Sequence, residues 1–222
     1  MSFDDISQIF REQLRALPPD SGRQTRTLAL FSAAVAVADE ECLRAVLQYG
    51  QRHEMGRDSF YEIVLQSYLF LGFPRMLVAA EVLGAVFGNH PEPTMLTAYS
   101  AAEGDDWFER GVALCRQIYR HNYEPLKERV EALAPDVFRW MINEGYGKVL
   151  ARPGLGPIDR ELAIVACLIV DGRVRQLHSH LKGALNVGCA PELLRQVIAD
   201  LDPIAPDLCR TARAIVAQEA IN

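Results

Sequence analysis

Apolar residues recur at spacings of three and four along almost the whole chain, whereas alternating, strand-like runs are short or missing. Breaks rich in proline and glycine interrupt this pattern, notably at residues 18–19, 72–74, 153–157 and 203–206. Between the breaks the pattern predicts about ten helices and no strand. We therefore expect an all-α fold.

The helical pattern occurs twice. Segment 23–87 begins RQTRTLALFSAAVAV and segment 157–216 begins PIDRELAIVACLIV, so that RTLAL aligns with RELAI and Gly56 with Gly188. Each copy reads as a buried apolar helix, an amphipathic helix that ends at a glycine, a short helix and a helix after a proline. We expect two tandem copies of one multi-helix core.

The repeat suggests how the chain is divided. Residues 1–105 would hold an N-terminal helix and the first, degenerate repeat, and residues 106–222 a helical connection and the second repeat with the candidate site. Neither copy has an obvious way to bury its second apolar face alone. We expect the two copies to pack together as one pseudo-symmetric unit.

Composition narrows the set of partners. The formal net charge of the 222 residues is −6 and no run of Lys or Arg occurs, which disfavours nucleic acid and anionic membranes as partners. No stretch of about 18 apolar residues is free of charge, so we expect no membrane span. The acidic N-terminus lacks the features of a secretory signal. These properties predict a cytoplasmic protein.

The five cysteines are scattered and form no CxxC motif, which argues against a disulfide framework, a zinc ribbon and a dithiol of the thioredoxin kind. No cluster of His, Cys and carboxylates has a recognisable metal-binding spacing. We therefore expect neither a metal nor a cofactor.

Two histidines stand close together in the stretch RQLHSHLKGALNVG, which reads as a helix. His178 and His180 lie about 160° apart around a helix axis and cannot enter one small cavity together. In the preceding helix, for which Asp159 is the cap candidate, Glu161 shares a stripe with apolar residues. A partly buried glutamate can exchange a proton, although a glutamate in a first turn can equally do no more than interact with the helix dipole. Glu161 and His180 are the candidates.

The motifs RELAIVACLIV and HLKGALNVGCAPELLRQVI resemble the core of the carboxymuconolactone decarboxylase and alkylhydroperoxidase superfamily. The upstream run GYGKVLARPGLGPIDRE resembles the decarboxylase branch, and GFPR in the first repeat resembles the family's last helix. The resemblance implies catalytic roles for Glu161 and His180. It aligns the two cysteines of the peroxidase branch with Arg173 and Gln176, and without sulfur at these positions dithiol peroxidase chemistry is disfavoured.

A decarboxylase-like lyase is therefore favoured, with a site free of sulfur and a small carboxylate or lactone as substrate. A carboxylate in a dry pocket needs a cation, for which Arg152 and Arg173 are the candidates, and Gln176 and Tyr146 are further candidates for substrate binding. Two alternatives stay open: a peroxide-reducing oxidoreductase that uses an unpaired cysteine, and a non-catalytic ligand-binding or scaffold protein.

The first copy has Thr27 and Gln48 where the second has the glutamate and the histidine. Neither side chain exchanges protons at pH 7. We expect the first copy to shape the pocket or an interface. Single-domain relatives resemble trimers of dimers, so a fused pair of domains predicts a homotrimer of this chain.

Overall fold

The computed structural model describes residues 3–20, 22–88 and 104–219. Within these ranges the chain is helical and has no strand, which confirms the all-α prediction. The first part contains α1 (Phe3–Ala16), α2 (Arg23–Val37), α3 (Glu40–Arg52) and α4 (Arg57–Phe87). The second contains α5 (Gly104–Tyr119), η3 (Arg120–Asn122), α6 (Tyr123–Leu133), α7 (Pro135–Trp140), η4 (Met141–Leu150), α8 (Pro157–Val170), α9 (Val174–Asn186), α10 (Pro191–Asp200) and α11 (Pro206–Glu219).

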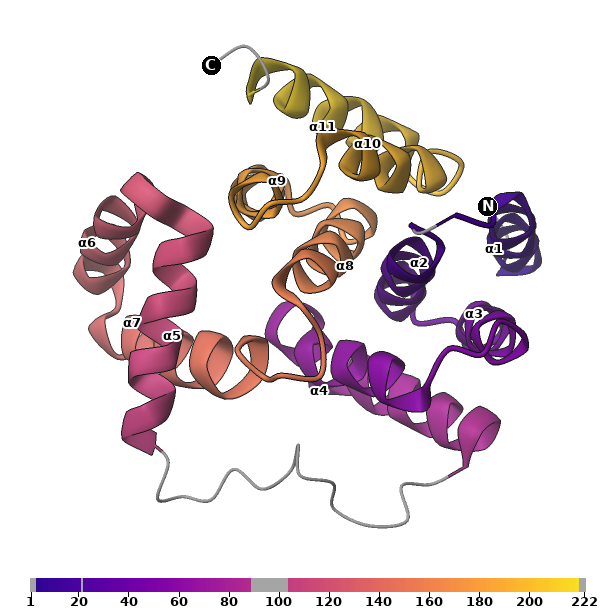
Figure 1. Ribbon diagram of the computed structural model, residues 1–222, viewed down its shortest axis with the longest axis horizontal. Helices are drawn as coiled ribbons and strands as arrows, with labels where there is room; N and C mark the ends of the chain where they lie inside the picture. Colours follow the sequence, from indigo (N-terminus) through magenta and orange to yellow (C-terminus); the bar gives the residue numbers. More distant parts are fainter. Residues whose placement is uncertain (1–2, 21, 89–103, 220–222) are drawn as a thin grey trace.

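Helices α2 and α8 lie side by side at the centre of the molecule (Figure 1) and share the most extensive contact between any two elements. Helices α1 and α3 flank α2, while α9, α10 and α11 flank α8. Helix α4 crosses below both central helices. Helices α5, α6 and α7 and the π-helix η4 form an outer layer beside α9.

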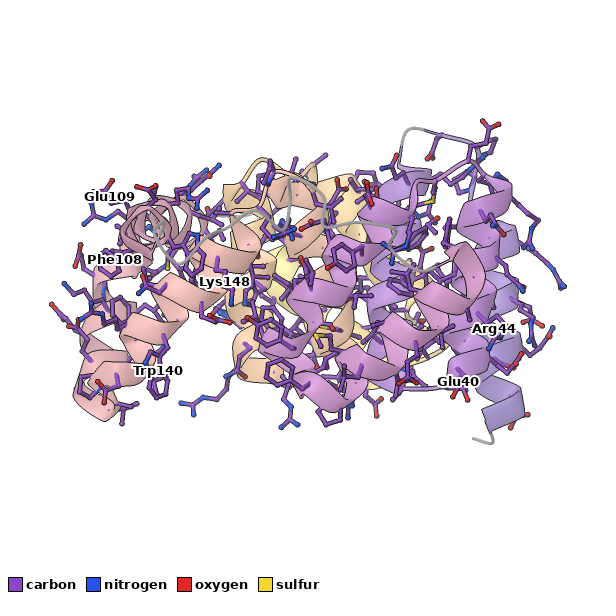
Figure 2. All side chains as sticks on the ribbon, turned by 90° about the horizontal axis from the view of Figure 1, so that it is seen from below. Glu40, Arg44, Phe108, Glu109, Trp140 and Lys148 are labelled. Carbon is purple, nitrogen blue, oxygen red and sulfur yellow. The ribbon has the colours of Figure 1, made fainter. Side chains whose placement is uncertain are left out.

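Helix α5 and η4 approach each other at backbone distance. A Cβ at Gly111 would meet the Ile142 carbonyl, and a Cβ at Gly147 would meet the Trp107 carbonyl. The glycines therefore permit this close packing, which fixes the position of the π-helix. Figure 2 shows Trp140 at the outer end of this layer, away from the molecule's core, and its side chain is largely exposed.

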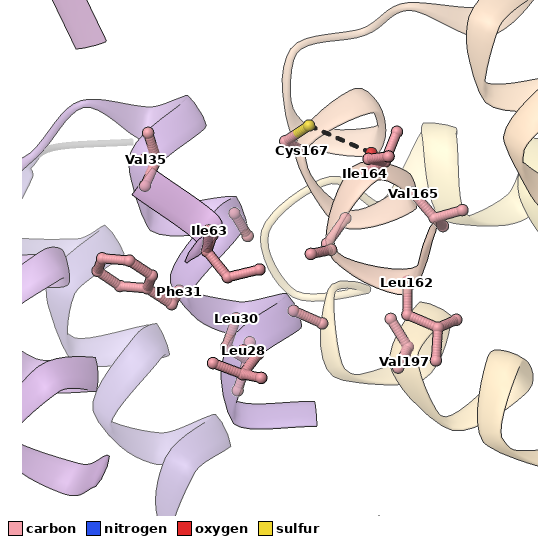
Figure 3. Close-up of a cluster of buried hydrophobic side chains, with 14 of the residues drawn as sticks. Leu28, Leu30, Phe31, Val35, Ile63, Leu162, Ile164, Val165, Cys167 and Val197 are labelled. Carbon is pink, nitrogen blue, oxygen red and sulfur yellow. Dashed lines mark hydrogen bonds between the residues drawn. The ribbon is translucent and has the colours of Figure 1, made fainter. Parts of the chain in front are cut away.

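The core is built on the two central helices (Figure 3). Residues 26–36 of α2 and 160–169 of α8 are buried on every side of their helices, as expected of helices that are apolar all round. Leu28 and Phe31 of α2 and Leu162 and Val165 of α8 are fully buried. Removing a fully buried leucine side chain down to alanine costs about 2–5 kcal/mol, so this contact anchors the fold.

Helix α4 is interrupted at Gly72, whose φ of 78° and ψ of 165° are not helical. Among the described residues it is the one helix long and apolar enough, by length and composition, to cross a membrane. The interruption divides it into residues 57–71 and 73–87, each shorter than the roughly 20 residues of a membrane-spanning helix. The absence of a membrane partner stays a prediction.

Polar contacts link the two halves of the chain in a reciprocal manner. The numbers of three pairs of residues differ by 134: Thr25 and Asp159, Arg26 and Arg160, Gln66 and Asp200. The Thr25 hydroxyl donates to Asp159 (2.6 Å), Arg26 Nε donates to Asp200 (2.8 Å) and Arg160 Nη1 donates to Gln66 (3.2 Å). A two-fold relation produces such reciprocity. The contacts support the predicted repeat, whose pseudo-symmetric packing stays a prediction.

The predicted division of the chain, between residues 105 and 106, falls in the first turn of α5. Residues 89–103, which precede this helix, lie outside the described residues. Described helices lie on both sides of this segment, α1 to α4 before it and α5 to α11 after it. The boundary itself stays a prediction.

Candidate functional site

Helices α8 and α9 form a helical hairpin around Gly172, which has a φ of 73°. Helix α8 begins at Pro157 with Gly156 as its N-cap, so the expectation that Asp159 caps it is wrong. Asp159 lies inside the first turn, where its carboxylate accepts from Thr25. Because the two helices run antiparallel, residues that are equally far from the turn lie opposite each other across the hairpin.

Glu161 of α8 and His180 of α9 are in direct contact. Nδ1 of His180 lies 2.9 Å from Oε2 of Glu161, and the residues are only 4% and 1% exposed, respectively. An ionised carboxylate can only accept a hydrogen bond, so Nδ1 carries the hydrogen opposite it. Nε2 is then the ring nitrogen that can take up or release a proton. The two candidate catalytic residues are thus brought together by neighbouring helices.

Gly183 creates the space for this carboxylate. It lies eleven residues after Gly172, as Glu161 lies eleven before it, so the two face each other across the hairpin. A Cβ at Gly183 would lie 2.6 Å from Oε2 of Glu161 and 2.8 Å from Cγ2 of Ile118. Sequence reasoning missed this glycine, although its distance from the turn was a usable signal.

Aromatic side chains from other elements surround the pair. The Phe70 ring of α4 meets the His180 ring edge-on, with 5.4 Å between the ring centroids. Tyr146 of η4 is buried and donates a hydrogen bond of 3.0 Å to the Tyr119 hydroxyl of α5. Burial raises the pKa of Tyr146 well above its usual value, and the charge of Glu161 adds to this effect. The charge of Glu161 therefore acts on the Tyr146 hydroxyl.

The charge of Glu161 also acts on a cysteine, whereas the sequence predicts a site free of sulfur. Cys115 of α5 is fully buried, and burial together with the charge of Glu161 raises its pKa to about 12. Packing of α5 against α9, rather than sequence spacing, places this residue. The thiol is protonated at neutral pH and supplies no thiolate.

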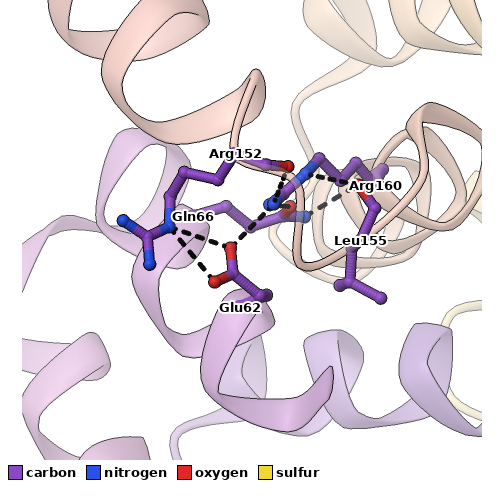
Figure 4. Close-up of polar contacts among 5 residues, drawn as sticks. All are labelled: Glu62, Gln66, Arg152, Leu155 and Arg160. Atoms are coloured by element: carbon purple, nitrogen blue, oxygen red, sulfur yellow. Dashed lines mark hydrogen bonds and ion pairs between the residues drawn. The ribbon is translucent and has the colours of Figure 1, made fainter. Parts of the chain in front are cut away.

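Arg152 belongs to a buried ionic cluster rather than to the Glu161–His180 contact (Figure 4). Its Nε donates to both carboxylate oxygens of Glu62, each at 3.1 Å. Arg160 Nη2 donates to Glu62 at 2.7 Å and to the Arg152 carbonyl, and Gln66 completes the cluster. The cluster joins α4 to the segment that leads into α8. Arg152 also lines a groove of about 450 Å³ beside α5.

The other substrate-binding candidates lie on the surface. Arg173 is the N-cap of α9, and its largely exposed guanidinium pairs with Asp171 at 2.7 Å. Gln176 is exposed. His178 is exposed as well, while His180 is buried, which confirms that the two histidines point apart. The structure therefore brings Tyr146, but neither Arg173 nor Gln176, into the surroundings of the pair.

Within the described ranges, no group of three or more His, Cys, Asp or Glu side chains could hold a metal ion. The pair itself offers one nitrogen and one carboxylate, which is fewer than a typical metal site provides. Its arrangement suits proton exchange.

Comparisons with known proteins give two similar proteins of the same name. A protein named Peroxisomal protein 2 from Schizosaccharomyces pombe is 29% identical over 133 residues, which cover 59% of this chain and 61% of that protein. A protein of the same name from Saccharomyces cerevisiae is 29% identical over 96 residues, 43% of this chain and 34% of that protein. The chain thus spans less than two thirds of either relative's length.

The family comparison covers the part of the chain that holds the pair. Residues 135–218, which run from α7 to α11 and include Glu161 and His180, match the model of the carboxymuconolactone decarboxylase family. In these residues the chain is similar to the carboxymuconolactone decarboxylase family.

Proposed function

We propose that this chain is a lyase that removes CO2 from a small carboxylated lactone, with Glu161 and His180 handling the proton. The observation that carries the proposal is the buried 2.9 Å contact between these two side chains. The match of residues 135–218 to the family model adds support, because decarboxylation is the reaction in that family's name.

The chemistry of decarboxylation matches the properties of the pair. Breaking the bond to the carboxylate releases CO2 and leaves the electron pair on the substrate, which then takes up one proton. Nε2 of His180 can deliver this proton, while Glu161 accepts a hydrogen bond from Nδ1–H and orients the ring. A positioned acid–base group of this kind contributes about 10²–10⁴-fold to a rate.

Reduction of peroxides is the weaker alternative. It requires an accessible thiol with a low pKa. All five cysteines are buried. Burial raises the pKa of Cys115, Cys167 and Cys209 to about 12 and that of Cys189 to about 11, and it also raises the pKa of Cys42.

Release of CO2 from 4-carboxymuconolactone tests the proposal. We expect turnover by the unchanged chain and a loss of at least about 100-fold in kcat for His180→Gln. His53→Gln is the matched control, because that histidine is exposed at the end of α3, lines neither pocket and should leave turnover unchanged. Absence of CO2 release from the unchanged chain, or equal turnover by His180→Gln, contradicts the proposal. Absence of turnover together with specific ligand binding would favour a non-catalytic role.

We propose the cytoplasm as its compartment and a homotrimer as its assembly. The names of the two yeast relatives supply the competing location, a peroxisome. Fluorescence imaging of the tagged chain distinguishes the two compartments: diffuse signal is expected, and punctate signal that overlaps a peroxisomal marker would contradict the cytoplasmic location.

A further inference from the structure

A pocket of about 190 Å³ opens between the end of α5, η3, α6 and the outer stripe of α9. A water molecule occupies about 30 Å³ in the liquid, so the pocket has room for a small organic molecule. On α9 the lining residues His178, Lys182 and Asn186 recur every four positions and therefore share one side of the helix.

The charged and titratable groups of this pocket are basic. Arg129 on α6 and Lys182 on α9 line it together with His178, and no Asp or Glu is among the lining residues. Hydroxyl and amide groups, including those of Tyr119 and Ser179, supply further hydrogen-bonding atoms. The net charge of the chain is −6, which repels anions as a whole. The basic groups of this pocket attract a small anion locally despite that repulsion.

The pocket lies directly behind the Glu161–His180 pair. Ile118 lines the pocket, and the position of a Cβ at Gly183 is within 3 Å of both the Ile118 side chain and the Glu161 carboxylate. Tyr119 also lines the pocket and accepts the hydrogen bond from Tyr146. Burial raises the pKa of Tyr119, the charge of Glu161 raises it further and that of Arg129 lowers it. Both charges therefore act on this one hydroxyl.

We propose that the pocket between α5, α6 and α9 binds the carboxylates of a small organic acid through Arg129 and Lys182. Two cations at the rim of a partly enclosed pocket suit a dicarboxylate, because each carboxylate then meets one cation. The role of this pocket as the carboxylate-binding part of the lyase's site rests on the proposed function. Its binding of a small anion depends only on the residues that line it.

The groove beside α5 fits this role less well. It is larger, at about 450 Å³, and Arg110 and Arg152 line it. Nε of Arg152, however, is already held by both oxygens of Glu62. The groove's lining includes no residue of α9, the helix that carries His180.

Calorimetric titration of the whole chain with succinate tests the proposal, with uncharged succinamide as the matched probe. We expect succinate to bind, succinamide not to bind, and the succinate affinity to fall as salt rises. Lys182→Gln and Arg129→Gln should each weaken succinate binding by at least about fivefold. Arg195→Gln removes an exposed arginine of α10 that does not line the pocket and should leave the affinity unchanged.

The proposal would be overturned if the unchanged chain did not bind succinate. It would also be overturned if Lys182→Gln and Arg129→Gln bound succinate as tightly as the unchanged chain. Thermal unfolding of each variant verifies that it is folded; Arg129 is exposed and Lys182 is half-buried. His180→Gln separates the two proposals: it should retain succinate binding while losing CO2 release. If CO2 release is absent but the pocket variants lose succinate binding, the proposed function fails and the anion site holds.

Discussion

Gly183 faces the Glu161 carboxylate so closely that a Cβ would lie 2.6 Å from Oε2. The same carboxylate oxygen contacts Nδ1 of His180, one helical turn away on α9. Space at one residue of the hairpin thus determines whether the acid and the imidazole can meet.

Gly183→Ala should therefore separate the pair. The new methyl group must displace either the Glu161 carboxylate or Ile118, and we expect a loss of about 1–3 kcal/mol in the free energy of unfolding. CO2 release by Gly183→Ala should also fall, because the acid and the imidazole are separated. Gly145→Ala is the control, because its nearest neighbour would be Leu69 at 4.0 Å, an ordinary contact. Urea unfolding of both variants measures the difference, and equal stability of the two would contradict the crowding at Gly183.

The buried ionic cluster gives a second prediction. Glu62→Gln removes the carboxylate that pairs with Arg152 and Arg160 inside the protein. Removing one partner of a buried ion pair costs about 3–5 kcal/mol, because the remaining charge is left buried. The exposed pair of Arg195 and Glu192 supplies the control: Glu192→Gln should cost no more than about 1 kcal/mol. A similar loss in both variants would mean that Glu62 does not hold the cluster together.

The thiols give a prediction about pH. Their pKa values are raised in the folded chain, chiefly by burial, to about 12 for Cys115 and about 11 for Cys189. Between the unfolded thiol pKa, about 8.5, and these values the folded state binds more protons than the unfolded state. The contribution of the thiols to stability is complete below pH 8 and falls as pH rises from about 9 to 12.

Ellman's reagent at pH 8 measures how readily each thiol reacts, which depends on its burial and its raised pKa. We expect the native chain to react slowly at all five cysteines and the denatured chain to react at once. One cysteine that reacts rapidly in the native chain would contradict the burial of the thiols and revive the peroxide-reducing alternative.

Assembly is tested by mass. The proposed homotrimer predicts a solution mass about three times the 24.8 kDa of one chain. Phe73 and Leu77 on the second segment of α4 are 60% and 54% exposed in the single chain. Light scattering after size-exclusion chromatography measures the mass, and a value of 24.8 kDa would contradict the trimer.

The helical class and the central helices follow from sequence pattern. Helices α2 and α8 are apolar on every face, and such helices have to be buried. The opposite orientations of His178 and His180 follow from helical geometry alone. Glu161 and His180 share a short hairpin, so their proximity is a local property that the sequence encodes.

The surroundings of the pair depend on long-range packing and were not predicted. Phe70, Cys115 and Tyr119 come from helices whose approach to the hairpin is set by the whole core. The partner of Arg152 is equally distant, since Glu62 lies ninety residues earlier in the chain. No periodicity in one sequence reports such pairings.

The most direct test of the central claim compares CO2 release by Glu161→Gln, His180→Gln and the variant that carries both changes. If the two side chains act as one proton-handling unit, each single change removes most of the activity and the double variant loses little more than either. Losses that multiply in the double variant, or a single variant with the kcat/KM of the unchanged chain, would contradict the account.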